Sequence, residues 1–357
     1  MPTRPQPAPP PIRRFLARGL LFFGGLALGG WALGKWRGIH DLPSAWPEVA
    51  VKWTAALQAE RPVNAVLLGS SVVRHHFDPV VLDSVTQPAG WRWHNLGISA
   101  SFPPESYAVA RALLEAPGAE ELELVVLDVL PLEYPHLENA GALRRSACMD
   151  APTWKDMMRV SRGDLAQQVT WTLLGITHLL DGWRVDIGSN QLPNPDGPRG
   201  FLPLDTLEVR WDALRYSREQ FLQDPAKRLQ RLAAEAADFD YRMGGEVADP
   251  CVGWTCPQEL IAWHVDQMRE LNTMAHDRGI HLVYSFQKLW ETNGCLYLAA
   301  LAELGPEHVI QLMGARDRIP LQRQAYWYDG AHLTAAGAER ISRDLGQTLL
   351  KACAPNR

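Results

Sequence analysis

An uncharged apolar stretch near the amino end constrains this chain more than any other feature. Sixteen residues without a charge separate Arg18 from Lys35, and with the apolar residues just before Arg18 the stretch reaches about 20 residues. A helix of that length crosses the hydrocarbon core of a bilayer if Arg18 extends its charged end toward the headgroups. We therefore expect a transmembrane anchor over residues 15–36. The proline-rich residues 1–14 that precede it are expected to form a disordered cytoplasmic tail.

The charges on either side of this stretch predict its orientation. Four arginines lie before it or at its start, whereas Lys35 and Arg37 follow it. The excess on the amino-terminal side favours a cytoplasmic amino end, a single pass through the inner (cytoplasmic) membrane and an exported, periplasmic body. Two alternatives remain open. A cleaved signal peptide would have a shorter apolar core and a small-residue cleavage site, and a soluble core helix would rarely carry so many glycines.

The body has the composition of an ordinary globular domain and shows no sign of a nucleic-acid or metal partner. Hydrophobic residues make up 46 % of the chain, and the formal net charge is −5. Since no basic stripe stands out, we expect no nucleic acid as a partner. No zinc-type Cys/His spacing, GxGxxG or Walker A motif occurs, so no metal or cofactor is expected. Cys251 and Cys256 either close a small disulfide loop or remain thiols.

Short apolar runs alternate with helical patterns along most of the body. This rhythm predicts an α/β domain over residues 43–357, with a parallel sheet covered by helices. Residues 135–255 break the rhythm and are interpreted as an insertion or lid. The expected strands are 63–68, 93–98, 121–130, 281–287 and 308–312, and the expected helices are 43–60, 103–116, 257–278 and 334–352.

A Gly-Ser-Ser triplet directly follows the first predicted strand. A serine in that position lies at the carboxyl edge of the sheet, where open α/β sheets bind ligands. The tight turn also lets backbone N–H groups face a reacting atom, as an oxyanion hole requires. We favour Ser71 over Ser70 as the nucleophile. Taken alone, the triplet is a weak signal, since most such triplets are ordinary turns.

A second candidate pair lies near the carboxyl end. Asp329 and His332 are three residues apart, just before a predicted helix whose expected N-cap is Thr334. In a turn, a carboxylate at this spacing can hold imidazole Nδ1–H and leave Nε2 free as a base for a serine hydroxyl. The alternative is structural, with Asp329 capping the turn and His332 at the surface.

Taken together, these blocks resemble the SGNH (GDSL-like) hydrolases. Gly69-Ser70-Ser71 matches their Gly-Asp-Ser, the stretch from Asp329 to Leu333 matches their closing block, and NLGISAS at 95–101 is similar to their second block. The resemblance covers about 60–130 and 257–352. It implies a flavodoxin-like three-layer parallel sheet with a helical insertion, preceded by one transmembrane helix. It also implies a Ser71, Asp329 and His332 catalytic triad.

The sequence departs from that family in its oxyanion-binding residues. The second-block glycine falls near Ala100, and the Gly-x-Asn-Asp block is absent, since the chain reads VLPLEY at 129–134. Backbone N–H groups of Ser71 and Ala100 are the expected donors, with Ser101 and Asn95 as further candidates for oxyanion or substrate binding. Loss of one donor typically costs about 10²–10³ in rate, which favours transfer or weak activity over efficient hydrolysis.

Charged residues near these blocks are weaker candidates. Arg74, His75 and His76 follow the nucleophile and are interpreted as one solvated turn of helix, with an anionic or sugar subsite as the alternative. Asp128 ends the third strand and is a candidate for the polar wall of the site.

These residues predict a serine-dependent esterase or O-acyltransferase that acts on acyl esters of cell-envelope glycans. The expected partners are an acyl ester or glycan substrate and a membrane protein that donates acyl groups. The alternative is a catalytically weak or inactive SGNH-like protein that binds glycans or scaffolds an envelope complex.

Overall fold

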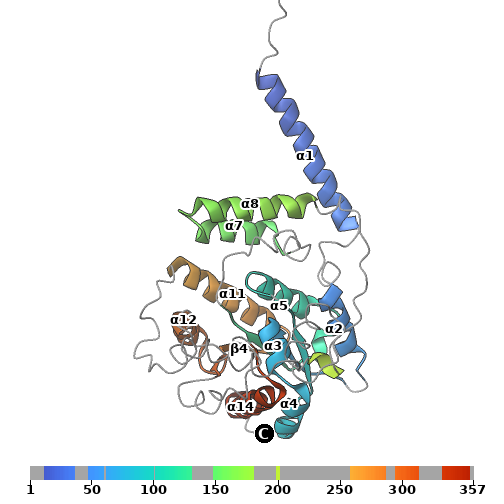
Figure 1. The fold of residues 1–357 in the computed structure, drawn as a ribbon, viewed down its shortest axis with the longest axis vertical. Helices are drawn as coiled ribbons and strands as arrows, with labels where there is room; N and C mark the ends of the chain where they lie inside the picture. Colours follow the sequence, from blue (N-terminus) through green and yellow to red (C-terminus); the bar gives the residue numbers. More distant parts are fainter. Residues whose placement is uncertain are drawn as a thin grey trace, which may run out of the picture. The chain divides into compact units, whose positions relative to one another are not determined.

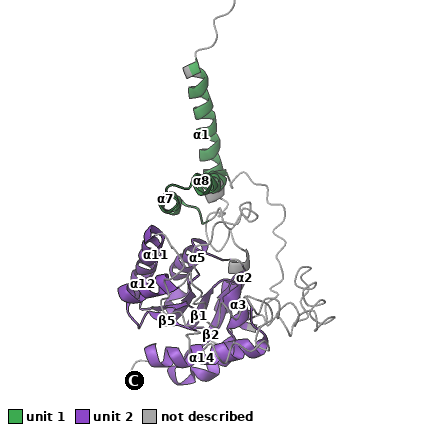
Figure 2. Cartoon of the chain, turned by 60° about the vertical axis from the view of Figure 1, so that its left-hand side comes forward, with its two compact units in different colours: residues 1–45, 135–189 green, residues 46–134, 190–357 purple. Residues whose placement is uncertain are grey.

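The structure is a computed structural model of the whole chain. It describes residues 12–36, 47–59, 62–99, 101–130, 148–180, 198–201, 258–286, 294–312 and 332–353. The chain divides into two compact units (Figure 2). One, here called the helical unit, comprises residues 1–45 and 135–189. The other, the sheet unit, comprises residues 46–134 and 190–357.

Five parallel strands form the centre of the sheet unit, in the order β2-β1-β3-β4-β5. Every residue of the first three strands is buried, which explains the apolar runs of β1 and of most of β3, whereas β2 also buries the polar His94 and Asn95. The predicted α/β class with a parallel sheet is thus confirmed, and the strand order is that of flavodoxin-like sheets. The strands are β1 (Ala65–Gly69), β2 (Trp93–Gly97), β3 (Leu124–Asp128), β4 (His281–Phe286) and β5 (Val309–Gln311).

Helices cover both faces of this sheet (Figures 1 and 2). Apolar side chains of β1, β3 and β4 pack with those of α14 in one large core cluster, to which α3 and α4 also contribute. On the other face, the Tyr284 hydroxyl of β4 donates to Met268 O of α11 (2.6 Å). The first face carries α3 (Ser71–His76), α4 (Pro79–Val85) and α14 (Ala335–Cys353); the second carries α5 (Glu105–Glu115), α11 (Gln258–His276) and α12 (Gly294–Leu304).

Short elements complete the sheet unit. Helix α2 (Pro47–Leu57) and the 3-10 segment η5 (Pro198–Gly200) contact β2, which is an edge strand. Two further 3-10 segments, η1 (Gln87–Ala89) and η2 (Ala119–Glu121), precede β2 and β3. Because η5 belongs to the predicted insertion yet lies against β2, the insertion is divided between the two units.

Three described helices form the helical unit: α1 (Ile12–Trp36), α7 (Ala151–Val160) and α8 (Leu165–Leu180). Within α1, residues Phe15–Leu33 are long and apolar enough to cross a membrane. This agrees with the anchor predicted over 15–36. The sequence patterns did not predict α7 and α8 as separate helices, nor α4 and α12 of the sheet unit.

The cysteines differ in state. Cys295 at the start of α12 is disulfide-bonded. Cys353 at the end of α14 is a half-buried free thiol, and burial raises its pKa to about 11. The small loop predicted between Cys251 and Cys256 lies outside the described residues.

Candidate active site

The turn after β1 is built around a glycine. Gly69 has φ +150°, and a Cβ there would lie 2.5 Å from Val73 Cγ2 and 3.0 Å from Asp128 Cβ. Both the backbone conformation and the lack of space therefore require glycine at this position. The turn takes the chain from β1 into α3, which contacts both β1 and β2.

The two serines of the triplet have different roles. Ser70 is the N-cap of α3, and its Oγ accepts a hydrogen bond from Val72 N (3.1 Å) while the residue is 1 % exposed. Ser71 is the first residue of α3 and is half-buried. Its hydroxyl is therefore the one that remains open to a reaction partner, in agreement with the choice of Ser71 over Ser70.

The position of His332 is fixed by its sequence neighbours. Leu333 is fully buried in the core cluster, and Thr334 Oγ1 accepts a hydrogen bond from Gly337 N (3.3 Å), as the predicted N-cap of α14. Farther along α14, buried Ser342 Oγ accepts from Asp78 N (2.9 Å), which ties the helix to the turn between α3 and α4. These contacts hold the carboxyl-terminal segment against the helix that carries Ser71.

Ser71 Oγ and His332 Nε2 lie 3.1 Å apart, although 261 positions separate the two residues. This distance is within hydrogen-bond reach, as a nucleophile and its general base require. The pair sits beyond the carboxyl end of β1. Strand β1 has β2 on one side and β3 on the other, so the strand order changes direction at β1. The pair therefore lies at the topological switch point, where such sheets bind ligands. Asp329, the third predicted member, lies outside the described residues.

Two further histidines surround this pair. The ring of His75 stands edge-on to that of His332, with centroids 5.1 Å apart, and the centroid of the His76 ring is 6.5 Å from the same ring. Arg74, His75 and His76 are 1 %, 4 % and 0 % exposed. The interpretation of these three residues as a solvated helical turn is therefore wrong, because α14 and the end of β2 cover α3.

Arg74 connects α3 to the loop that follows β2. Its Nη1 donates to Ser99 Oγ (2.8 Å). That loop contains the predicted oxyanion residues, so the contact links the nucleophile helix with them. The sequence analysis missed this link. The signal was present as a serine-containing run directly after a buried strand.

Asn95 has a structural role in this arrangement. The side chain is fully buried, and Nδ2 donates to Val73 O and to Phe77 O (2.8 Å each) while Oδ1 accepts from Gly97 N (2.8 Å). Both amide hydrogens are thus used by main-chain carbonyls of α3 and its C-cap. This corrects the prediction that Asn95 binds the oxyanion or substrate: it holds α3 against β2.

The other residues of the loop and of β3 also lie near the carboxyl edge of the sheet. Ser101 is 2 % exposed, and its backbone N–H donates to Ile98 O (3.2 Å). Ala100 lies outside the described residues. Asp128, at the end of β3, is 3 % exposed and accepts a hydrogen bond from Ser285 Oγ (3.2 Å). Asp128 therefore lies beside Gly69, beneath the turn that leads to Ser71, and its carboxylate is hydrogen-bonded to β4.

A separate polar pair lies in the opposite layer of the sheet unit. The Tyr107 hydroxyl of α5 and His264 Nδ1 of α11 lie within hydrogen-bond distance of each other (2.7 Å), and both side chains are buried. Burial raises the pKa of Tyr107 above its usual value and lowers the pKa of His264 to about 3. The pair is therefore neutral near neutral pH and joins the two helices.

Among the residues that the structure describes, no group of three or more His, Cys, Asp or Glu side chains is arranged to hold a metal ion. Comparison of the chain with protein-family models, with curated proteins and with solved structures gives no match.

Proposed function

We propose that this protein is a serine-dependent esterase or O-acyltransferase of the SGNH type. The observation that carries the proposal is the 3.1 Å contact between Ser71 Oγ and His332 Nε2 at the carboxyl edge of a parallel sheet. Two blocks from opposite ends of the chain meet there, each in the position that the resemblance to SGNH hydrolases implies.

In the proposed reaction, Ser71 Oγ attacks the carbonyl carbon of an acyl ester while His332 Nε2 takes the hydroxyl proton. The tetrahedral intermediate collapses to an acyl-enzyme, and the imidazolium returns the proton to the leaving alcohol. A second alcohol or water then attacks the acyl-enzyme, again with His332 as the base. Asp329 is proposed to orient the imidazole and to stabilise its charged form.

The oxyanion would be bound by backbone N–H groups of Ser71 and Ala100. The Asn95 amide is unable to help, because both of its hydrogens are donated to α3 carbonyls. A site with main-chain donors alone lacks the side-chain amide that SGNH hydrolases use. This supports acyl transfer, or slow hydrolysis, over fast hydrolysis.

The proposed location follows from α1. If α1 crosses the inner membrane with its amino end in the cytoplasm, the sheet unit lies on the exported side. The disulfide at Cys295 fits an oxidising compartment. Acyl esters on envelope glycans are the substrates available there, and a membrane protein that supplies acyl groups is the proposed partner.

The competing proposal is a glycan-binding or scaffolding protein with this fold and little catalysis. The commitment of Asn95 to the main chain favours it, since the site then has one donor fewer. The Ser71 and His332 contact argues for catalysis, because a binding protein has no need of a hydroxyl and an imidazole at hydrogen-bond distance.

A fluorophosphonate probe distinguishes the two. The full-length protein in detergent should be labelled at Ser71, and Ser71→Ala should abolish the labelling. Ser70→Ala is the matched control: it removes the neighbouring hydroxyl and an N-cap worth about 1 kcal/mol, but should leave the labelling in place. An unlabelled wild-type protein, or labelling that survives Ser71→Ala, would reject the enzyme.

A further inference from the structure

Helix α8 carries an exposed aliphatic stripe on one face. Spacings of three and four residues align its members on the same side of the helix. Their side chains are between 39 and 74 % exposed. We call this set the α8 stripe; it consists of Leu165, Val169, Leu173, Ile176 and Leu179.

The opposite face of α8 packs within the helical unit. Trp171, Leu174 and His178 are buried there. A Cβ on Gly175 would lie 3.1 Å from Trp154 Cδ1 of α7, so the two helices approach closely. Helix α8 is therefore apolar on both sides, but α7 covers one side alone, which leaves the stripe directed away from α7.

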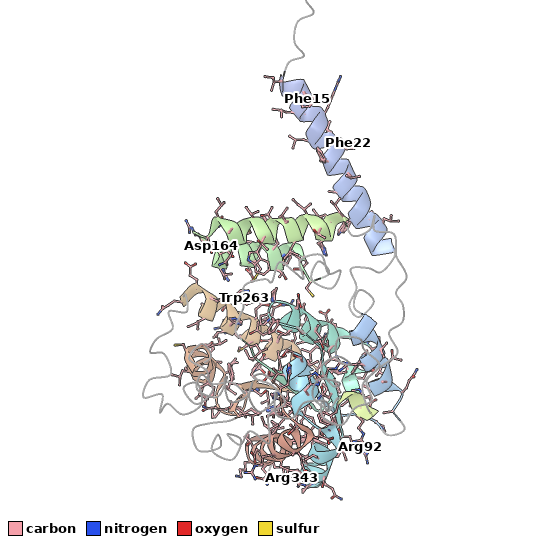
Figure 3. All side chains as sticks on the ribbon, viewed as in Figure 1. Phe15, Phe22, Arg92, Asp164, Trp263 and Arg343 are labelled. Carbon is pink, nitrogen blue, oxygen red and sulfur yellow. The ribbon has the colours of Figure 1, made fainter. Side chains whose placement is uncertain are left out.

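Helix α1 contacts α8 near the end of α8 opposite Asp164, and the rest of α1 extends to the side away from α7 (Figures 1 and 2). Gly30, near the carboxyl end of α1, is buried, whereas the Phe15–Leu33 span is almost entirely exposed. Figure 3 shows Phe15 and Phe22 on the part of α1 distant from α8, and Asp164 at the end of α8 distant from α1. The apolar span of α1 and the α8 stripe thus share one side of the helical unit.

The charges near the stripe lie before α8 and not within it. Helix α8 contains no Lys, Arg, Asp or Glu from Leu165 to Leu180. The exposed basic residues Lys155, Arg159 and Arg162 of α7 and of the turn before α8 are balanced by Asp150, Asp156 and Asp164. An exposed aliphatic face on a helix without charges, with the charged residues outside it, fits a helix whose apolar face is buried in the interfacial region of a membrane.

We propose that α8 lies in the plane of the membrane, on the surface where the carboxyl end of α1 emerges, with its stripe inserted among the lipid chains. The proposal rests on α1 being the membrane anchor. The continuity of the stripe with the apolar span of α1 selects lipid as the occupant over a second copy of the chain. Part of the predicted insertion is thus a second membrane contact.

Spin labels on the full-length protein test this in phosphatidylcholine and phosphatidylglycerol vesicles. A keto amino acid replaces Val169, Leu173, Lys155 or Leu21, one position at a time, and carries the spin label. The native cysteines are then not labelled. Collisions with oxygen report lipid, and collisions with a water-soluble nickel chelate report water. We expect oxygen to dominate at Val169, Leu173 and the α1 reference Leu21, and nickel to dominate at Lys155.

The other outcomes overturn the proposal in distinguishable ways. Nickel access at Val169 and Leu173 with oxygen access at Leu21 would leave the anchor but remove α8 from the membrane. Shielding from both reagents, with spin–spin broadening, would identify a second copy as the occupant. Nickel access at Leu21 would remove the anchor as well. Fluorophosphonate labelling of Ser71 tests the proposed catalytic function independently of all these results.

Two variants provide an independent test of whether the α8 stripe lies in lipid. With the label at Ile176, Val169→Lys combined with Leu173→Lys should move the label from oxygen to nickel access, since charges are costly among lipid chains. Gln168→Lys, beside the stripe, is the control and should leave the label in lipid. An unchanged label in the double variant would contradict the proposal.

Discussion

Gly97, at the carboxyl end of β2, lies directly against the backbone of Arg74 in α3. A Cβ at this position would collide with Arg74 N and lie 2.9 Å from Asn95 Oδ1. Strand and helix therefore meet with no side chain between them. The position of α3, and with it that of Ser71, depends on the smallest residue in a neighbouring strand.

Gly97→Ala should push α3 outward and disturb the contact between Ser71 and His332. We expect a loss of about 1–3 kcal/mol in the free energy of unfolding, as for overpacking, together with a slower reaction with fluorophosphonate. Thermal unfolding and the rate of labelling measure the two effects. Gly279→Ala is the control: it has open space but φ +72°, so it should cost about 1 kcal/mol and leave the labelling rate alone. Equal behaviour of the two variants would show that the close approach does not position the site.

Replacement of His332 tests the general base. His332→Ala should lower the hydrolysis of an activated ester such as p-nitrophenyl acetate by roughly 10³-fold or more, because Ser71 loses its proton acceptor. The variant should remain folded, which circular dichroism checks. His276→Ala, at an exposed position of α11, should retain full activity. Retained ester hydrolysis in His332→Ala would exclude the proposed role of the imidazole.

Asn95→Asp separates a structural role from a catalytic one. A carboxylate in place of the amide would face the carbonyls of Val73 and Phe77 without a hydrogen to donate, and we expect the free energy of unfolding to fall by about 3 kcal/mol. Asn272→Asp, at a half-buried position of α11, is the control and should change the free energy of unfolding much less. If Asn95 bound the oxyanion instead, its substitution would spare stability and slow the reaction.

His264 should make stability depend on pH. Its pKa is lowered to about 3 in the folded protein, while the unfolded chain has the usual value near 6.5. Protonation therefore favours unfolding: the stabilisation is complete above pH 6.5 and is lost as the pH falls below it. Between pH 7.5 and 5 the loss is about 2 kcal/mol.

Thermal unfolding of the detergent-solubilised protein across this pH range measures the effect. His264→Gln should unfold at a lower temperature at neutral pH, because its contact with Tyr107 is altered, but should show a flatter dependence on pH. The exposed His276→Ala should keep the slope of the wild-type protein. A wild-type slope in His264→Gln would assign the pH dependence to other groups.

Most of the sheet was predictable because buried parallel strands such as β1, β3 and β4 are largely apolar on both faces. The predicted run at 121–130 is longer than β3, which occupies Leu124–Asp128, because Leu122, Val129 and Leu130 beside the strand are apolar as well. Helices α7 and α8 were not predicted separately. Helix α8 is apolar on both faces, so its sequence lacks the alternation of polar and apolar residues that identifies an amphipathic helix.

The candidate site was predictable in part. The glycine turn after a strand and the histidine before the last helix both mark positions at the carboxyl edge of the sheet, and the structure brings Ser71 and His332 together there. The role of Asn95 was not predictable, because its partners are main-chain carbonyls that any sequence provides. The burial of Arg74 was missed because a six-residue helix gives no periodicity from which to infer its covered face.

The contact of η5 with β2 has a consequence for engineering this chain. Lys52 Nζ donates to Gly97 O (2.6 Å) and Gly200 O (3.4 Å), Arg199 pairs with Asp83, and a Cβ on Gly200 would collide with Asn95 O. These residues shield the rim of the sheet, where an open strand invites intermolecular pairing. A shortened protein that lacks the whole of 135–255 would expose that rim and aggregate, whereas an excision that ends before Pro198 would preserve its cover.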